Sequence, residues 1–361
     1  MKTNVRALVD GYDHFIGIDH HKRTSYVTIK DREGEIVKKG GIVSTKASIA
    51  DFIEAIPCDG DNLEVPRRIA VIECGRTYRP MYRWLSEIAD DVVLAHPGGL
   101  KIISETVYKD DKIDSGKLSG LLMLGMIPEA HAASDEAWER RMVLRHRIML
   151  VKMQTEVKNR IHVVVDLHPD ALPRRPDVTD MFGKLGTAWL ESLKIPDSDR
   201  RRLDELLEIL EFLGAMIKKS DSLVRKMVRE DKTCSLLKTI PGIGDFYAAL
   251  IAAEIDDIDR FRGPKNFVSY TGLVPGRDSS GGKESSGSIH KRGNKYLRWA
   301  LVEAAIPATR SDLALKNKYD SVVARKGGGK DAKKLAKVAV AGKLAWIVYR
   351  VLKDRRPYEI R

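Results

Sequence analysis

The order of secondary structure in the first hundred residues is the strongest constraint on how this chain folds. Three segments rich in β-branched residues, at 14–19, 24–30 and 35–41, follow one another with short turns between them. The next predicted elements are a helix capped by Ser44 and reaching about Ile56, a strand at 68–73, a helix at 78–88, a strand at 91–95 and a helix opened by Pro97. A three-strand meander followed by alternating helices and strands predicts an α/β domain built on one mixed sheet.

This order of elements is that of the ribonuclease-H-type fold. Four acidic residues lie at the ends of its predicted strands or three residues apart in one segment. Asp19 ends the first strand and Glu73 ends the fourth, and the fold places these two strands side by side. Asp111 and Asp114 are three residues apart, so a helix would carry them on one face. Converging carboxylates repel one another unless a divalent cation binds between them, and all-oxygen ligation suits Mg²⁺ or Mn²⁺. The set therefore predicts a metal site for phosphodiester chemistry, although each acid taken alone is more often a strand or helix cap.

The middle of the chain is predicted to be helical. Residues 134–167 are nearly free of Gly and Pro, and a second long helix is predicted from about Ser198 to Arg229. Apolar residues recur there every seven positions, at Leu203, Leu210, Ile217 and Val224, with Leu206 and Leu213 at the second heptad position. Heptads favour a helical hairpin or a coiled coil, and an amphipathic helix packed on its own domain fits equally well.

Positive charge is confined to the C-terminal third. The 361 residues carry a net charge of +12. Residues 261–361 hold 23 basic and 8 acidic side chains, a net charge of +15, whereas residues 1–260 hold 40 basic and 43 acidic ones. This distribution favours a polyanionic partner, and nucleic acid first, over a basic surface kept only for solubility.

A Pro-Gly-Ile-Gly turn at residues 241–244 precedes an apolar helix. Such a turn is typical of a helix-hairpin-helix motif. Gly242 and Gly244 would let the backbone approach a phosphate, and the helix N-terminus would offer free N–H groups to it. The simpler alternative is an ordinary turn between two helices.

Further along, a Gly- and Ser-rich loop is surrounded by cations. A serine in it could attack a phosphodiester while nearby basic side chains stabilise the charge on the phosphoryl oxygens. The basic residues are Lys283, Lys291, Arg292 and Arg298. His290 suits a phosphate contact better than a general base, and by composition alone the segment fits an ordinary loop.

Cysteine usage and hydropathy exclude several classes of protein. Three scattered cysteines, Cys58, Cys74 and Cys234, fit neither a disulfide scaffold nor a Cys-rich zinc module. No apolar run approaches the ~20 residues of a membrane helix, and the first 13 residues lack a secretory pattern. We therefore expect a cytoplasmic protein without membrane contact.

Four motifs together resemble one protein family. They are Gly17-Ile-Asp-His-His-Lys, Val71-Ile-Glu-Cys-Gly, Lys109-Asp-Asp-Lys-Ile-Asp and the stretch from Leu237 to Ala305. They resemble insertion-sequence transposases with a RuvC-like DEDD domain and a serine-bearing C-terminal domain, the bridge-RNA-guided recombinases. The resemblance implies a RuvC-like α/β domain at 10–130, a helical coiled-coil region at 131–232, and a mainly α-helical transposase domain with a helix-hairpin-helix-like motif at 233–361.

The resemblance also implies roles and partners. It assigns the metal-binding acids to Asp19, Glu73, Asp111 and Asp114, with Mg²⁺ or possible Mn²⁺, and the nucleophile to Ser280, with Ser279 as nearest competitor. The implied partners are the DNA of the element ends and target, a structured guide RNA and further copies of the chain, as a dimer or tetramer. The implied location is the prokaryotic cytoplasm, with the nucleoid. His20, His21, Asp110 and the Ser115-Gly116 pair depart from the usual family pattern.

Two other readings remain open on the sequence. A RuvC-like structure-selective nuclease would need the four acids and a metal-activated water but no serine. A non-enzymatic nucleic-acid-binding protein would use the acids only as caps. A covalent protein–DNA adduct distinguishes the recombinase from both.

Overall fold

The computed structural model describes residues 10–56, 66–103, 111–170, 176–280, 283–289 and 293–360. Of residues 102, 111–112, 275–280 and 283–289 it describes the backbone alone. The chain divides into two compact units, Met1–Ala132 and Ala133–Arg361. The boundary lies close to the predicted end of the first domain, whereas the helical region and the C-terminal region belong to one unit.

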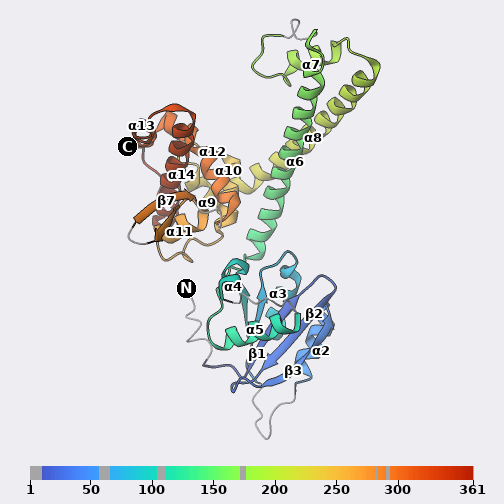
Figure 1. Ribbon diagram of the computed structural model, residues 1–361, viewed down its shortest axis with the longest axis vertical. Helices are drawn as coiled ribbons and strands as arrows, with labels where there is room; N and C mark the ends of the chain where they lie inside the picture. The colour runs from blue at the N-terminus through green and yellow to red at the C-terminus, as the bar shows by residue number, and fades with distance from the viewer. Residues whose placement is uncertain are drawn as a thin grey trace. The chain divides into compact units, whose positions relative to one another are not determined.

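The described part of the N-terminal unit is an α/β domain, in which helices pack on one five-stranded sheet (Figure 1). Its elements are β1 (His14–His20), β2 (Thr24–Lys30), β3 (Ile36–Val43), α2 (Lys46–Glu54), β4 (Arg68–Glu73), α3 (Tyr78–Ile88), β5 (Asp91–Ala95), α4 (Pro97–Ile103) and α5 (Asp111–Met123). The strands and the helices α3 and α4 lie where the sequence pattern predicts them.

The sheet has the order β3-β2-β1-β4-β5. β1 pairs antiparallel with β2, and β2 with β3, which confirms the meander. β1 pairs parallel with β4, with Ile18 opposite Ile72, and β4 pairs parallel with β5. The predicted adjacency of the first and fourth strands is therefore confirmed. Asp19 and Glu73 each come one residue after the last β1–β4 pair, at the carboxyl ends of these two neighbouring strands.

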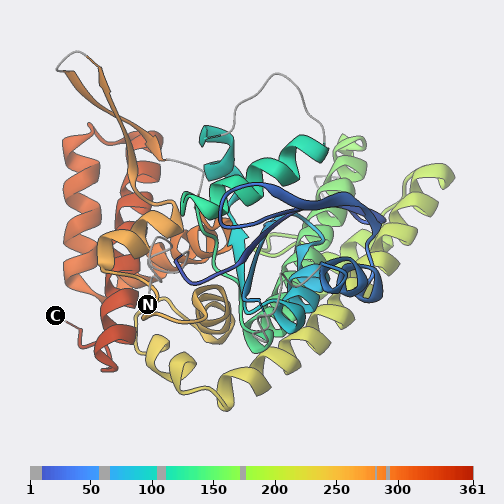
Figure 2. The ribbon, with the colours of Figure 1, turned by 90° about the horizontal axis from the view of Figure 1, so that it is seen from below.

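Both faces of the central strands are buried, which explains their nearly continuous apolar sequences. Successive side chains alternate between the faces. Phe15 and Ile69 join a core with Leu118 and Leu122 of α5, whereas Ile16, on the opposite face, is also fully buried. Figure 2 shows α5, in teal, on one side of the sheet and α2 and α3, in blue and light blue, on the other.

Gly17 lets α5 lie directly against β1. A Cβ built at Gly17 would lie 2.2 Å from the carbonyl oxygen of Ser115 and 2.5 Å from the backbone nitrogen of Ser119. The Ser115 hydroxyl is hydrogen-bonded to Thr28 Oγ1 at 2.8 Å, where both groups are buried. This contact fixes the height and rotation of the helix whose first turn carries Asp111 and Asp114.

The predicted cap of α2 is wrong by one residue. Thr45, not Ser44, is the N-cap, and its hydroxyl accepts a hydrogen bond from the backbone N–H of Ser48. The Ser44 hydroxyl instead contacts Ser25 Oγ at 2.8 Å and donates to the carbonyl of His21. Because Ser44 bonds across the β1–β2 turn, the next hydroxyl residue caps the helix.

The described part of the C-terminal unit is helical except for one β-hairpin. Its elements are α6 (Asp135–Asp166), α7 (Lys184–Ser192), α8 (Asp197–Arg229), α9 (Lys232–Leu237), α10 (Asp245–Ile255), α11 (Pro264–Thr271), β6 (Pro275–Ser280), β7 (Lys283–Ile289), α12 (Lys295–Ser311), α13 (Leu313–Arg325) and α14 (Gly329–Asp354). Among the described helices, none is long and apolar enough to cross a membrane.

The two long helices α6 and α8 form a hairpin with α7 at its closed end (Figure 1). The heptad residues Leu203 and Leu213 are buried in a core shared with Val157 and Ile161 of α6, and Leu206, Leu210 and Ile217 pack against that core. The heptad pattern of α8 is thus satisfied within the chain by α6. Of the alternatives that the sequence left open, the structure has the helical hairpin.

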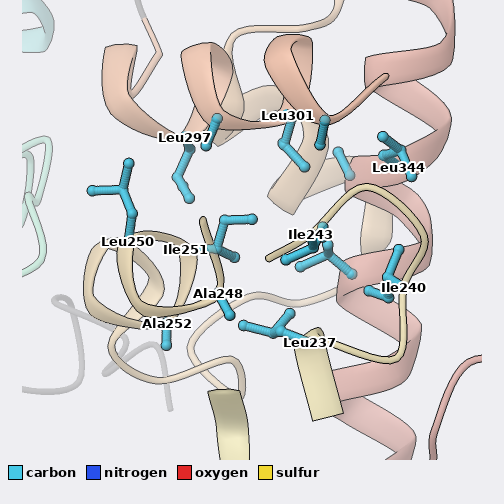
Figure 3. Close-up of a cluster of buried hydrophobic side chains, with 14 of the residues drawn as sticks. Leu237, Ile240, Ile243, Ala248, Leu250, Ile251, Ala252, Leu297, Leu301 and Leu344 are labelled. Carbon is cyan, nitrogen blue, oxygen red and sulfur yellow. The ribbon is translucent and has the colours of Figure 1, made fainter. Parts of the chain in front are cut away.

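A second core joins α9, α10, α12 and α14 (Figure 3). Leu237, Ile243, Leu250, Leu301 and Leu344 meet there, and all five are buried. The turn between α9 and α10 enters this core. Gly242 has a φ of +82°, and a Cβ there would lie 2.4 Å from the carbonyl oxygen of Ala304 in α12.

Replacing Gly17 with alanine should destabilise the N-terminal unit by about 3 kcal/mol or more, because the new methyl group meets backbone atoms that cannot turn aside. The matched control is Gly116→Ala in α5, where a Cβ meets nothing within 4 Å. That change should be neutral or stabilise by about 0.5–1 kcal/mol. Native-state hydrogen exchange of the β1 amides measures both effects, and equal protection in the two variants would contradict the close packing.

A second pair of variants tests the α9–α10 turn. Gly242→Ala should lower the free energy of unfolding by about 3 kcal/mol or more, because it combines a positive φ with a backbone collision. Gly244→Ser should leave stability unchanged, since a Cβ there has no neighbour within 4 Å and serine is a favourable N-cap residue. Thermal unfolding compares the two, and an unchanged midpoint in Gly242→Ala would refute the packing explanation.

Candidate functional site

The predicted acids of the N-terminal unit come from three elements. Asp19 and Glu73 lie on the sheet face that α5 covers, because they continue the alternation of Phe15 and Val71 along neighbouring strands. The Asp19 side chain is 20% exposed, and His21 Nε2 lies 3.5 Å from its carboxylate. Glu73, one residue past the last paired position of β1 and β4, is exposed.

The other two acids begin α5. Asp114 is 43% exposed and forms an ion pair with Lys117, with Nζ 3.4 Å from Oδ1. Asp111 is the first residue of the helix, and its side chain lies outside the described part of the structure. Since Ser115 is held against the sheet by Gly17 and Thr28, the first turn of α5 is tied to the strand that carries Asp19.

The donor set of these four positions is entirely carboxylate oxygen, which fits Mg²⁺ or Mn²⁺ rather than a thiol- or imidazole-binding metal. Among the described side chains, no three His, Cys, Asp or Glu residues lie close enough together to hold a metal ion. The structure therefore places Asp19 and Glu73 at the carboxyl ends of two neighbouring strands, and Asp114 in the helix that covers the same face of the sheet. The described side chains do not form a complete set of metal ligands there.

His20, which departs from the family pattern, has a structural partner at each ring nitrogen. Nδ1 lies 2.9 Å from Ser25 Oγ and Nε2 lies 3.1 Å from the carbonyl oxygen of Thr77. Burial lowers the pKa of His20, although the Thr77 carbonyl opposes this shift. Burial, with the nearby Glu73 carboxylate, raises the pKa of Cys74, so its thiol stays protonated at neutral pH. His20, because both its ring nitrogens have partners, and Cys74, because its thiol stays protonated, are poor candidates for metal ligands.

The two glycines of the α9–α10 turn have different surroundings. Gly242 is required by packing on α12, which is sufficient reason for a glycine at that position. Gly244 is the N-cap of α10, is exposed, and has open space where a Cβ would be. Of these two glycines, Gly244 is the one beside which a phosphate could approach the N-terminus of α10.

The serine segment is a β-hairpin, so the expectation of a loop is wrong there. β6 pairs antiparallel with β7, with Ser279 opposite Glu284 and Ser280 opposite Lys283. The two residues between the strands are Gly281 and Gly282, and a Gly-Gly pair between two strand segments is a recognised hairpin signal that could have revealed it. Backbone pairing holds this segment, whose Gly and Ser content had suggested irregular structure.

The cations predicted around the serine are only partly visible. Lys283 is the first residue of β7, described by its backbone, whereas His290, Lys291 and Arg292 lie outside the described residues. Arg298 lies in α12, and its NH1 atom is buried without a hydrogen-bond partner among the residues that the structure describes. The structure thus keeps Arg298 and Lys283 in the same unit as Ser280.

One polar cluster was missed by sequence reasoning. Glu254 of α10 is fully buried and binds Arg145 of α6 and Asn294, the N-cap of α12. A signal was present, since Glu254 is an isolated acid in the otherwise apolar run Ala248–Ile255. Buried acids are almost always paired, so such a residue predicts a specific partner even when that partner cannot be named.

Two transposase families match this chain, one in its N-terminal part and one in its C-terminal part. Residues 16–168 match a DEDD transposase family, and residues 234–320 match the family described as "Transposase IS116/IS110/IS902 family". A probable family 20 transposase of Pseudomonas aeruginosa is 27% identical over 298 residues, which cover 82% of this chain and 84% of the relative. The transposase for insertion sequence element IS1328 of Yersinia enterocolitica is 26% identical over 293 residues, covering 80% and 82%.

A shorter match extends the comparison to DNA inversion. A pilin gene-inverting protein of Moraxella bovis is 34% identical over 128 residues, which cover 35% of this chain and 39% of the relative. Both family matches, in this order along the chain, and relatives named transposases over most of its length lead to one conclusion: the chain belongs to the IS116/IS110/IS902 family of insertion-sequence transposases, enzymes of DNA strand transfer.

Proposed function

We propose that this transposase exchanges DNA strands through a covalent phosphoserine link at Ser280, directed by a structured RNA from its own element. The observation that carries the proposal is the position of Ser280. It ends β6 opposite Lys283, in a hairpin that lies within the matched transposase region and within the third of the chain whose net charge is +15. A serine paired with a lysine in the strand register suits attack on a phosphodiester.

The step balances as a transesterification. A bond forms between Ser280 Oγ and a DNA phosphorus, one phosphorus–oxygen bond to deoxyribose breaks, and the serine proton ends on the departing DNA oxygen. A hydroxyl of the exchanged strand then attacks the same phosphorus and releases Ser280 with its proton restored. No external energy source is needed, because each phosphodiester broken is replaced by another ester of phosphate.

Asp19, Glu73, Asp111 and Asp114 would hold the divalent cation, Mg²⁺ or Mn²⁺, on the evidence of their donor chemistry. When bound, such an ion supplies charge neutralisation at a phosphate. The chain itself contributes the arrangement of these acids, through the parallel pairing of β1 with β4 and the seat of α5 on Gly17.

The proposed nucleic-acid contacts are Gly244, Lys283, Lys291, Arg292 and Arg298, with Gly242 acting through its packing on α12. Gly244 would offer the N-terminus of α10 to a phosphate independently of base sequence. The basic side chains would bind DNA or the guide RNA through their phosphates.

A dimer or tetramer of the chain is part of the proposal. Besides the heptads packed on α6, α8 exposes a second series of large apolar side chains: Ile209 is 46%, Phe212 64% and Leu223 53% exposed. These residues fit the spacing of another heptad seam, so this side of α8 is suited to pairing with a second copy.

Replacing Ser280 with alanine should abolish the covalent protein–DNA adduct while leaving nucleic-acid binding intact, because only the attacking oxygen is lost. The measurement uses purified protein, Mg²⁺, co-expressed RNA and labelled DNA carrying the element junction, followed by denaturing electrophoresis. Ser279→Ala is the matched control and should keep the adduct.

The other outcomes are equally informative. An adduct that persists in Ser280→Ala and vanishes in Ser279→Ala moves the nucleophile by one residue. Cleaved DNA without an adduct in the wild type would replace the serine mechanism with a metal-activated water, as in a RuvC-like nuclease.

Asp19→Asn and Asp114→Asn should each lower the rate of adduct formation by about 10²-fold or more, since each removes a charge that would stabilise the reacting phosphate through a cation. DNA affinity should stay at the wild-type value. Asp51→Asn, on the exposed side of α2, is the control for loss of one acid in the same unit. Wild-type rates in both site variants, over a titration of Mg²⁺, would count against a metal-binding role.

A further inference from the structure

The two ends of the serine hairpin are pinned to each other at its base. The chain leaves α11 through Gly272, whose φ is +71°, and returns at Gly293. A Cβ at Gly293 would lie 2.3 Å from the backbone nitrogen of Gly272, so the two segments are in direct backbone contact. The next residue, Asn294, donates its backbone N–H to the carbonyl of Tyr270 at 2.7 Å.

Asn294 connects this base to the rest of the unit. Its Oδ1 accepts hydrogen bonds from the backbone N–H groups of Tyr296 and Leu297, at 2.9 and 3.1 Å, and thereby caps α12. Its Nδ2 donates to Glu254 Oε2 at 2.9 Å. Through its backbone and its side chain, this one residue therefore joins the hairpin base, the start of α12 and the interior of α10.

Glu254 is in turn held by α6. Arg145 donates from Nε to Oε1 at 2.8 Å and from NH2 to Oε2 at 2.9 Å, a bidentate pair with a fully buried carboxylate. Arg141 donates to the backbone carbonyls of Ala253 and Glu254 at 2.7 and 3.1 Å. The carboxylate that Asn294 binds is thus fixed from both its oxygen atoms and its backbone.

Stability alone does not call for such a cluster. A buried ion pair generally contributes little net stability over an apolar replacement, because desolvation offsets the attraction. The surrounding core, with Ala248, Leu250, Leu297 and Leu301, is well able to hold the helices together by apolar packing. What a bidentate, directional cluster adds is a single defined geometry, and it is placed at the base of the segment that carries the serine.

We propose that Glu254 and Asn294 are positioning residues, which fix the base of the β6–β7 hairpin and so hold Ser280 in place for attack on the DNA phosphate. The proposal rests on the proposed role of Ser280. It assigns these two residues no contact with DNA. Their effect would pass through the backbone of the hairpin, since small displacements of a reacting group strongly lower a rate.

The central test is an exchange of functional groups. Asn294→Asp keeps an N-cap acceptor on α12 but places a second carboxylate against Glu254 in place of the amide donor. Asn294→Ser also keeps an N-cap acceptor, and it removes the amide donor to Glu254 without adding a charge. Asn317→Asp, on the exposed surface of α13, adds the same charge without touching the cluster.

We expect Asn294→Asp to slow adduct formation at saturating DNA by about 10²-fold, with DNA affinity unchanged, and Asn294→Ser to slow it less, because it adds no charge beside Glu254. Asn317→Asp should react at the wild-type rate. Backbone hydrogen exchange in the hairpin should rise in both variants, and more in Asn294→Asp. A wild-type rate in Asn294→Asp, or a slower rate with unchanged hairpin exchange, overturns the proposal.

If Asn294→Asp does not fold, Asn294→Ser takes its place, because it keeps the cap and removes only the donor to Glu254. A slower rate with faster hairpin exchange then supports positioning, and a wild-type rate overturns it. Should Ser280→Ala retain the adduct, the nucleophile assignment fails independently. Hairpin exchange in the Asn294 variants then decides the structural claim alone, with unchanged exchange overturning it.

Discussion

The direct contact of helix α5 with strand β1 at Gly17 is the constraint on which the N-terminal site depends. A side chain at that position would lift the helix off the sheet, because the nearest atoms belong to the backbone of Ser115 and Ser119. With glycine there, the buried hydrogen bond between Ser115 and Thr28 fixes the rotation of the helix about its own axis. Acids that are nearly a hundred residues apart in the chain are thereby brought to one face of one sheet.

In the C-terminal unit, glycines permit close backbone contacts at two further places. Gly242 lets the α9–α10 turn approach the backbone of α12, and Gly293 lets the end of the serine hairpin approach Gly272. In each case the contact is between backbones, which cannot change rotamer and so leave little freedom of position. The buried cluster of Arg145, Glu254 and Asn294 adds directional hydrogen bonds to this framework.

The departures from the family pattern acquire physical reasons in this structure. Ser115 makes the hydrogen bond that seats α5, and His20 ties the end of β1 to the carbonyl that precedes α3. Neither replaces an acid. The arrangement of the acids, at strand ends and at the start of a covering helix, is compatible with both residues.

Local sequence patterns determined much of this protein: the meander and the parallel strands, the acids Asp19 and Glu73 at strand ends, the two long helices, and the motifs of a transposase family. These features depend on periodicity and on neighbouring residues, which a linear pattern contains. The contact of Gly17 with α5, the packing role of Gly242 and the partners of Glu254 were decided only by tertiary structure. Each of them depends on a contact whose strength comes from burial and close approach, and no local pattern specifies which distant residue supplies it.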